Sequence, residues 1–251
     1  MLIADGFEML EISATVMGRQ SAVHPSLIWD AGNAILVDAG FPGLGDRIRE
    51  AIEGAGVNFA ALNRIVITHQ DIDHIGSLPE ILAAAPQEVE VISGVREKPF
   101  IEGEKKLVKL TPEAIARITA GMPPEMAEER RQAMLRILKN PPKAKVGRTV
   151  ANGDRIDCCG GITVIDTPGH TPGHICLYCH SSKTLIAGDA MVIEDGQLLG
   201  PREQVAFDIG MARESLKKLT SYEIDRVVCY HGGLYEDGAG DRIAALAAQA
   251  A

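Results

Sequence analysis

Short apolar runs rich in valine and isoleucine alternate with amphipathic stretches along most of the chain. Runs of this length and composition predict buried β-strands. The expected strands are residues 11–17, 26–30, 34–38, 64–68, 89–92, 148–150, 161–166, 175–178, 184–186 and 225–230. Leu44, Ile48 and Ile52 are instead spaced as on one face of a helix. The helices expected on either side of the central segment are residues 43–54, 77–84, 211–219 and 242–250.

This order of elements predicts the fold class. Strands that alternate with helices are typical of an α/β protein. The closely spaced strands between residues 148 and 186 suggest a meander, with turn signals at Asn152-Gly153 and at Gly160-Gly161.

The central segment, residues 96–146, has a different character, and we call it the insertion. Its charge content rises, its prolines cluster, and helices are expected at residues 112–120 and 123–138. We therefore expect one domain over residues 1–251 that contains a helical insertion. The second helix carries an apolar stripe of Met126, Ala127, Met134, Leu135 and Leu138. Such a stripe has to be buried, and packing against the domain or against a homodimer partner is favoured over a mobile lid.

Composition narrows the protein class. Hydrophobic residues make up 46% and charged residues 24% of the chain, which are globular proportions, and no run is long enough for a transmembrane helix. Residues 1–19 lack the basic flank and apolar core of a secretory signal, so we expect a cytoplasmic protein without membrane association. The net charge of −9 disfavours nucleic acid as a partner and favours a small-molecule substrate.

The five cysteines do not suggest a disulfide framework, because their number is odd. Cys176 and Cys179 form a C-x-x-C pattern within an expected strand, where positions three apart face opposite sides. We interpret them as buried structural residues rather than as metal or redox ligands.

Polar clusters follow several of the expected strands. The most concentrated is Thr68-His-Gln-Asp-Ile-Asp-His-Ile-Gly76, which has two histidines and two aspartates within six residues. Further clusters are Thr-Pro-Gly-His twice over at residues 167–174, Gly188-Asp189, and His231-Gly-Gly, and Asp38 ends an earlier strand. Imidazoles and carboxylates at strand ends are suited to bind divalent metal ions.

Taken in order, these motifs resemble those of the metallo-β-lactamase superfamily. The resemblance runs from Asp38 to His231 and implies an αββα sandwich with metals at one sheet edge. It implies a first metal held by His69, Asp71 and His170, a second held by Asp73, His74 and His231, and Asp189 as a bridge. A bridging hydroxide would complete the site, and Asp73 could also orient that hydroxide as a catalytic residue.

Asp71 departs from the resemblance, because most hydrolytic members carry histidine at this position. The extra carboxylate makes the metals weaker electrophiles and favours harder ions. Two divalent ions are expected, with zinc implied by the family and iron or manganese as alternatives. The alternative for Asp71 is a place outside the coordination sphere, although we favour ligation.

Further residues are candidates to support the site or to contact substrate. Asp38 and His174 are expected to orient ligands rather than to bind metal, with a purely structural role for His174 an equal alternative. The connection after Asp189 contributes Arg202 and Phe207 as candidates, and a plain surface loop is the alternative. Tyr230 and Tyr235 flank the last predicted ligand; each is a candidate to bind a carbonyl oxygen or, more simply, a packed tyrosine.

The leading functional hypothesis is a metal-dependent hydrolase of a small ester, lactone or thioester. The doubled Thr-Pro-Gly-His motif is similar to that of glyoxalase II and of acyl-homoserine lactonases. However, Val192 stands where those lactonases place tyrosine, and the 20 residues after His231 are too few for the glutathione-binding domain of glyoxalase II. The alternatives are a non-haem iron protein with redox or dioxygen chemistry, a phosphodiesterase, and a metal-binding module without turnover.

Overall fold

The computed structural model describes residues 1–249, except for the side chains of Val16 and Arg19. Its larger sheet has seven strands in the order β1-β2-β5-β6-β7-β8-β9. They are β1 (Leu2–Ala4), β2 (Phe7–Met9), β5 (Ser26–Trp29), β6 (Ala34–Val37), β7 (Arg64–Ile67), β8 (Glu90–Gly94) and β9 (Arg148–Val150). The strands from β6 to β9 run parallel to one another.

The second sheet has six strands in the order β10-β11-β12-β13-β16-β17. They are β10 (Arg155–Ile156), β11 (Ile162–Asp166), β12 (Ile175–Cys179), β13 (Thr184–Gly188), β16 (Arg226–Cys229) and β17 (Gly233–Tyr235). Two separate hairpins are formed by β3 (Ile12–Val16) with β4 (Arg19–Val23), and by β14 (Val192–Glu194) with β15 (Gln197–Leu199).

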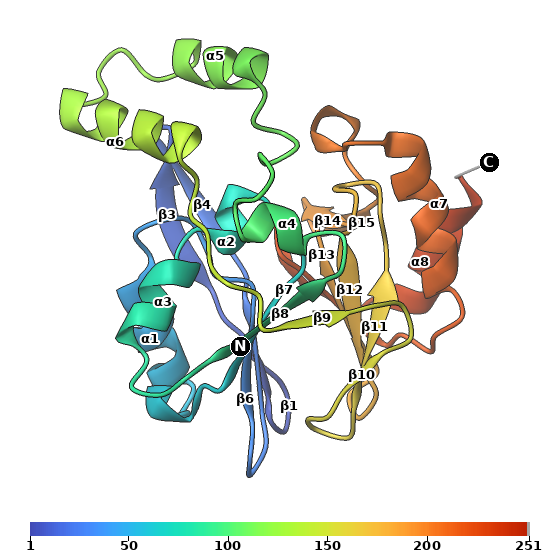
Figure 1. Ribbon diagram of the computed structural model, residues 1–251. Coiled ribbons are helices and arrows are strands. Elements are labelled where there is room, and N and C mark those ends of the chain that lie inside the picture. Colours follow the sequence, from blue (N-terminus) through green and yellow to red (C-terminus); the bar gives the residue numbers. More distant parts are fainter. Residues whose placement is uncertain (250–251) are drawn as a thin grey trace.

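Helices cover the outer face of each sheet, which gives the αββα sandwich (Figure 1). On one side lie α1 (Gly45–Gly54) and α3 (Leu78–Ala84), and on the other α7 (Ile209–Leu219) and α8 (Ala239–Ala248). The expected last helix reached to Ala250, which lies outside the described residues. Shorter helices are α2 (Ile72–Ile75), α4 (Lys98–Ile101), η1 (Phe59–Ala61) and η2 (Glu203–Val205).

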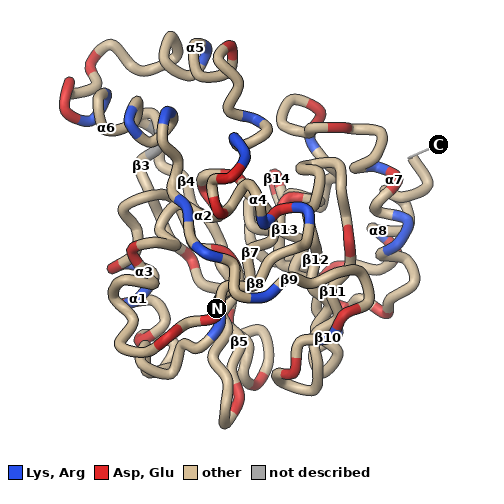
Figure 2. Tube along the Cα trace, in the orientation of Figure 1, with Lys and Arg blue, Asp and Glu red and all other residues tan. Residues whose placement is uncertain are grey.

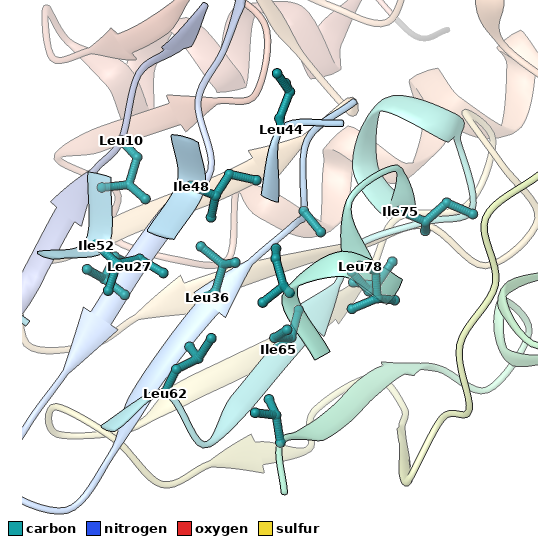
Figure 3. Close-up of a cluster of buried hydrophobic side chains, with 14 of the residues drawn as sticks. Leu10, Leu27, Leu36, Leu44, Ile48, Ile52, Leu62, Ile65, Ile75 and Leu78 are labelled. Atoms are coloured by element: carbon teal, nitrogen blue, oxygen red, sulfur yellow. The ribbon is translucent and has the colours of Figure 1, made fainter. Parts of the chain in front are cut away.

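Three buried clusters correspond to the three interfaces between these four layers. Leu36, Ile48 and Ile52 belong to the cluster between the larger sheet and its helices (Figure 3). The neighbouring Ile35 belongs to the cluster between the two sheets, because successive strand residues face opposite sides. A third cluster packs the second sheet against α7 and α8. Apolar burial on both faces of each sheet therefore fixes the frame on which the polar strand ends sit.

The cysteines agree with the structural interpretation. Cys176 and Cys179 are buried on opposite faces of β12, in different apolar clusters, and none of the five cysteines forms a disulfide. No helix among residues 1–249 is long and apolar enough to cross a membrane.

The insertion contains α5 (Pro112–Ala120), at the predicted residues, and α6 (Glu128–Lys139). Both helices project beyond the sandwich, near the β3–β4 hairpin (Figure 1). The predicted start of the second helix at Pro123 is wrong by five residues, because the backbone of Ala127, with ψ 138°, is not helical. Glu128 and Glu129 lie in the first turn of the helix, where their negative charges interact favourably with the positive end of the helix dipole.

The predicted meander is also wrong in one respect. Strands β10 to β13 do form an antiparallel meander, but β9 is not part of it. It pairs in parallel with β8 in the other sheet, on the far side of the insertion in the sequence. Local spacing could not reveal this, because the pairing depends on where the chain returns after about 50 residues of insertion.

Candidate metal centre

The polar clusters lie at one edge shared by the two sheets. Asp38 follows β6, and the turn that carries His69 and Asp71 follows β7, which runs parallel to β6. In the second sheet, Asp189 follows β13 and His231 comes soon after the parallel strand β16. Because parallel strands end on the same side of a sheet, residues far apart in the sequence meet here.

The first ligand group comprises His69, Asp71, His170 and Asp189. Asp71 Oδ2 lies 3.3 Å from His69 Nε2 and 3.0 Å from His170 Nε2. Asp189 Oδ2 lies 3.2 Å from the same His170 nitrogen. Donor atoms about 2.0–2.2 Å from a single ion stand roughly 3.3 Å from one another in a tetrahedron, so these separations fit one metal ion.

The second ligand group comprises Asp73, His74 and His231. His231 Nε2 lies 3.1 Å from Asp73 Oδ2, and His74 Nε2 lies 3.2 Å from Asp189 Oδ1. Asp189 Oδ2 also lies 3.6 Å from His231 Nε2, so this carboxylate is shared by the two groups.

Unpartnered polar atoms support the same interpretation. Among the described residues, His69 Nε2, His74 Nε2 and Asp189 Oδ1 are buried without any hydrogen-bond partner. Burying such atoms unsatisfied costs free energy, and lone pairs that converge are what a metal ion would satisfy. The residues present therefore fit a divalent metal centre, with nitrogen and oxygen donors of the types that zinc, iron and manganese accept.

Asp38 sets the protonation of two histidines from beneath, as an orienting residue. The Thr68 hydroxyl donates to Asp38 Oδ2 at 2.8 Å, so toward His69 Nδ1, 3.0 Å away, its oxygen has to accept. His74 Nδ1 likewise donates to Asp38 Oδ2 at 2.9 Å. Both imidazoles therefore carry a proton on Nδ1, so Nε2 is the nitrogen that can offer a lone pair to a metal.

His174 has a positioning role. Its Nε2 accepts the backbone N–H of Asp189 at 3.0 Å, so the proton is on Nδ1, 2.8 Å from the Thr167 hydroxyl. A Cβ on Gly188 would lie 2.7 Å from that Nε2, so glycine is needed for the approach. His174 thus fixes the turn that carries Asp189 and has no lone pair left for a metal.

The carboxylates control the charge of the centre. Burial alone would raise the pKa of Asp71, but His69, His170 and Lys109 together hold it well below the usual range. Burial would lower the pKa of His74, yet Asp38, Asp189 and Asp73 raise it well above its ordinary value. The second group therefore favours a cation, whether a proton or a metal ion.

A pocket of about 180 Å³ opens over the two groups. Arg202 lines it and forms an ion pair with Glu194, and its contact with a substrate stays a prediction. Val192 also lines it, so the position where lactonases place tyrosine is apolar here. Phe207 is not among the residues that line it: the residue is 56% exposed, and its backbone N–H donates to the backbone oxygen of His170.

The two tyrosine candidates are both packed residues. Tyr230 is buried, its ring lies 3.8 Å from that of His74, and its hydroxyl donates to the backbone oxygen of Asp73. It therefore supports the second group from behind. Tyr235 packs in the cluster beside α7 and α8 and does not line the pocket. Neither side chain is placed to bind a substrate carbonyl.

Sequence reasoning missed three residues near the centre. Lys109, from the insertion, lines the pocket and contacts the first group. Gln70 and Glu97 are buried and hydrogen-bonded to each other between the metal-site turns. The only sequence feature that could have indicated Lys109 is its place among the apolar residues of the run 107–110. A single charged residue in such a run is usually exposed to solvent, so this feature does not predict a place in the site.

Comparison with known proteins links this geometry to a family. Residues 18–231 match the family model described as the metallo-beta-lactamase superfamily. The probable metallo-hydrolase YflN of Bacillus subtilis (strain 168) is 28% identical over 216 residues, which is 79% of this chain and 75% of that protein. A hydroxyacylglutathione hydrolase of Rhizobium meliloti (strain 1021) is 47% identical over 47 residues, 18% of each chain.

Solved structures share the fold. A metallo-beta-lactamase family protein, TTHA1429 from Thermus thermophilus, superposes with a TM-score of 0.67. The match covers 99% of this chain and 80% of that one at 23% identity, a level that supports the fold alone.

Proposed function

The chain belongs to the metallo-β-lactamase superfamily, and on that premise we propose that it hydrolyses a small ester, lactone or thioester with two divalent metal ions. The convergence of the two ligand groups on Asp189 supports the dinuclear part of this proposal. The short, 47-residue similarity to a hydroxyacylglutathione hydrolase favours an acyl substrate. Divalent ions held here would supply Lewis acidity and lower the pKa of a bound water to about 7.

The chain's own residues divide the remaining work. His69, Asp71 and His170 would hold one ion, and Asp73, His74 and His231 the other, with Asp189 between them. Asp73 also faces the pocket, where its carboxylate can accept a hydrogen bond from the attacking water and orient it. Arg202, which lines the pocket and is paired with Glu194, would offer its remaining N–H groups to a polar substrate group, and Met191 and Val192 would offer an apolar surface.

A metal analysis and a substrate panel test this proposal. Protein purified without added metal is expected to approach two metals per chain and to turn over lactones, esters or thioesters under nitrogen. Asp73→Asn should remove most of this turnover, whereas the matched exposed control Asp46→Asn should retain it.

Several results would contradict the proposal. A metal ratio near one that added metal does not change would overturn the dinuclear site. Iron with an oxygen-dependent reaction would favour the redox alternative, which the carboxylate at Asp71 motivates. Turnover of phosphodiesters alone would favour a phosphodiesterase.

A further inference from the structure

We propose that Lys109 is a built-in counter-cation of Asp71 that competes with a metal ion for the first ligand group. The first group would then bind metal more weakly than the second. This inference rests on the metal binding of the proposed function but is independent of the substrate.

The contacts of the lysine place it on metal-facing atoms. Lys109 Nζ lies 2.5 Å from Asp71 Oδ2 and 2.6 Å from His170 Nε2, the two atoms that face each other across 3.0 Å. An imidazole nitrogen has one lone pair, so His170 Nε2 cannot accept from the ammonium and bind a metal at once. A metal that takes its place in this group therefore has to displace the lysine.

The segment that carries Lys109 is fixed to the turn that carries His69 and Asp71. The backbone N–H of Val108 donates to Gln70 Oε1 at 2.8 Å. Gln70 is fully buried, and both its backbone N–H and its side-chain Nε2 donate to Glu97 Oε2 at 2.9 Å. The residue next to Lys109 is thus tied to the same turn as the carboxylate that Lys109 contacts.

The same buried carboxylate holds the turn of His170. Glu97 Oε1 accepts from the Thr171 hydroxyl at 2.9 Å and from the Gly173 backbone N–H at 2.7 Å. Glu97 therefore links both turns of the first group to the lysine segment. Basic and acidic residues both occur along the segment between α4 and α5 (Figure 2). Its exposed Lys105 and Lys106, in contrast to Lys109, form no ion pair with a carboxylate among the described residues. This hydrogen-bond network therefore fixes the position of Lys109, which is not a freely moving surface side chain.

Charge explains why a lysine belongs in this position. Asp71 adds one negative charge relative to the histidine of most hydrolytic members, and Lys109 adds one positive charge beside it. Together they restore the net charge that a neutral histidine would give. In the second group, no lysine or arginine whose side chain the structure describes forms an ion pair with Asp73, whose charge stays available to a metal. The first group thus has a cation of the chain itself, Lys109, that competes with a metal ion, and the second group has no such lysine or arginine among the described side chains.

Metal titration of the metal-free protein tests the proposal. The His231→Ala background weakens the second group, so that the first is observed by itself. In that background Lys109→Met is expected to raise the affinity for zinc and for manganese by about 10- to 100-fold, the range typical of changes around metal ligands. Lys109→Arg, which keeps the cation, and the exposed control Lys106→Met should both leave the affinity near that of the background.

Thermal unfolding supplies a second readout. With His231 intact, metal saturation should raise the Tm of Lys109→Met more than that of the wild type, because a tighter ligand stabilises the folded state more. Lys109→Gln serves in the same way if the methionine variant does not fold.

The outcomes separate the inference from the proposed function. No metal binding by the wild type or by any variant would overturn the proposed function. Tight binding with unchanged or lowered first-group affinity in Lys109→Met would overturn only the role of the lysine. Equal gains in Lys109→Met and Lys109→Arg would also contradict it, since the charge would then not be responsible.

Discussion

The two ligand groups differ in where their supporting residues come from. His74 of the second group is supported by residues of the sandwich, whereas Asp71 of the first group contacts a lysine from the insertion. His74 is held by Asp38 at the end of β6 and by the ring of Tyr230 after β16. The same strands that bury the apolar core therefore also orient the ligands of the second group. The first group is completed by a segment outside those strands, so its properties can vary with the insertion while the fold is kept.

The largest effect is expected for the residue that both groups share. In Asp189→Ala each group loses a carboxylate oxygen, and the metal content should fall from two toward none, with hydrolysis lost as well. Elemental analysis after dialysis against metal-free buffer measures this. Retention of one tightly bound metal would show that one group is independent of the other.

Asp38→Asn is expected to affect the second group more than the first. If the NH₂ of the introduced amide faces His74 Nδ1, that nitrogen has to accept, and the imidazole proton moves to Nε2, where the metal would bind. If the NH₂ instead faces the backbone N–H of Thr68, two hydrogen-bond donors point at each other and neither is satisfied. The affinity of the second group should fall by about 10- to 100-fold. Competition with a chromophoric chelator measures it, with Asp46→Asn as the control. An unchanged second affinity would remove Asp38 from its orienting role.

Asp71→His should have a smaller effect, confined to the first group. The substitution supplies a nitrogen ligand and leaves Lys109 without its carboxylate, so the first group should shift its preference from iron or manganese toward zinc while the fold is retained. Binding of zinc and manganese in direct competition checks the shift, and circular dichroism checks the fold. Unchanged selectivity would show that Asp71 does not determine the metal.

Part of the centre could be predicted from the sequence because its signals are local. Apolar runs predicted both ends of β6, β7, β13 and β16 to within two residues. This is possible because a buried strand shows itself as a run of consecutive apolar side chains. The motif between Thr68 and Gly76 and the later single residues indicated which side chains would meet. In the structure those side chains do lie together, in two groups.

Other features were decided by contacts between distant parts of the chain. The strand β9 joined the larger sheet rather than the meander, and neither Phe207 nor Tyr235 lines the pocket. Lys109 reached Asp71 across 38 positions through the Gln70–Val108 hydrogen bond. Neither periodicity nor a motif encodes such a contact, because it exists only once separate turns have been brought to the same edge.

The sequence by itself thus determined the layers and the types of ligand, since hydrophobic period and residue chemistry are properties of short segments. Only the tertiary structure decided what stands behind each ligand: Asp38 beneath His74, His174 beneath Asp189 and Lys109 against Asp71. The physical reason is that hydrogen bonds and charges act over a few ångströms in space. Their partners are chosen by the folded chain and not by nearness in sequence.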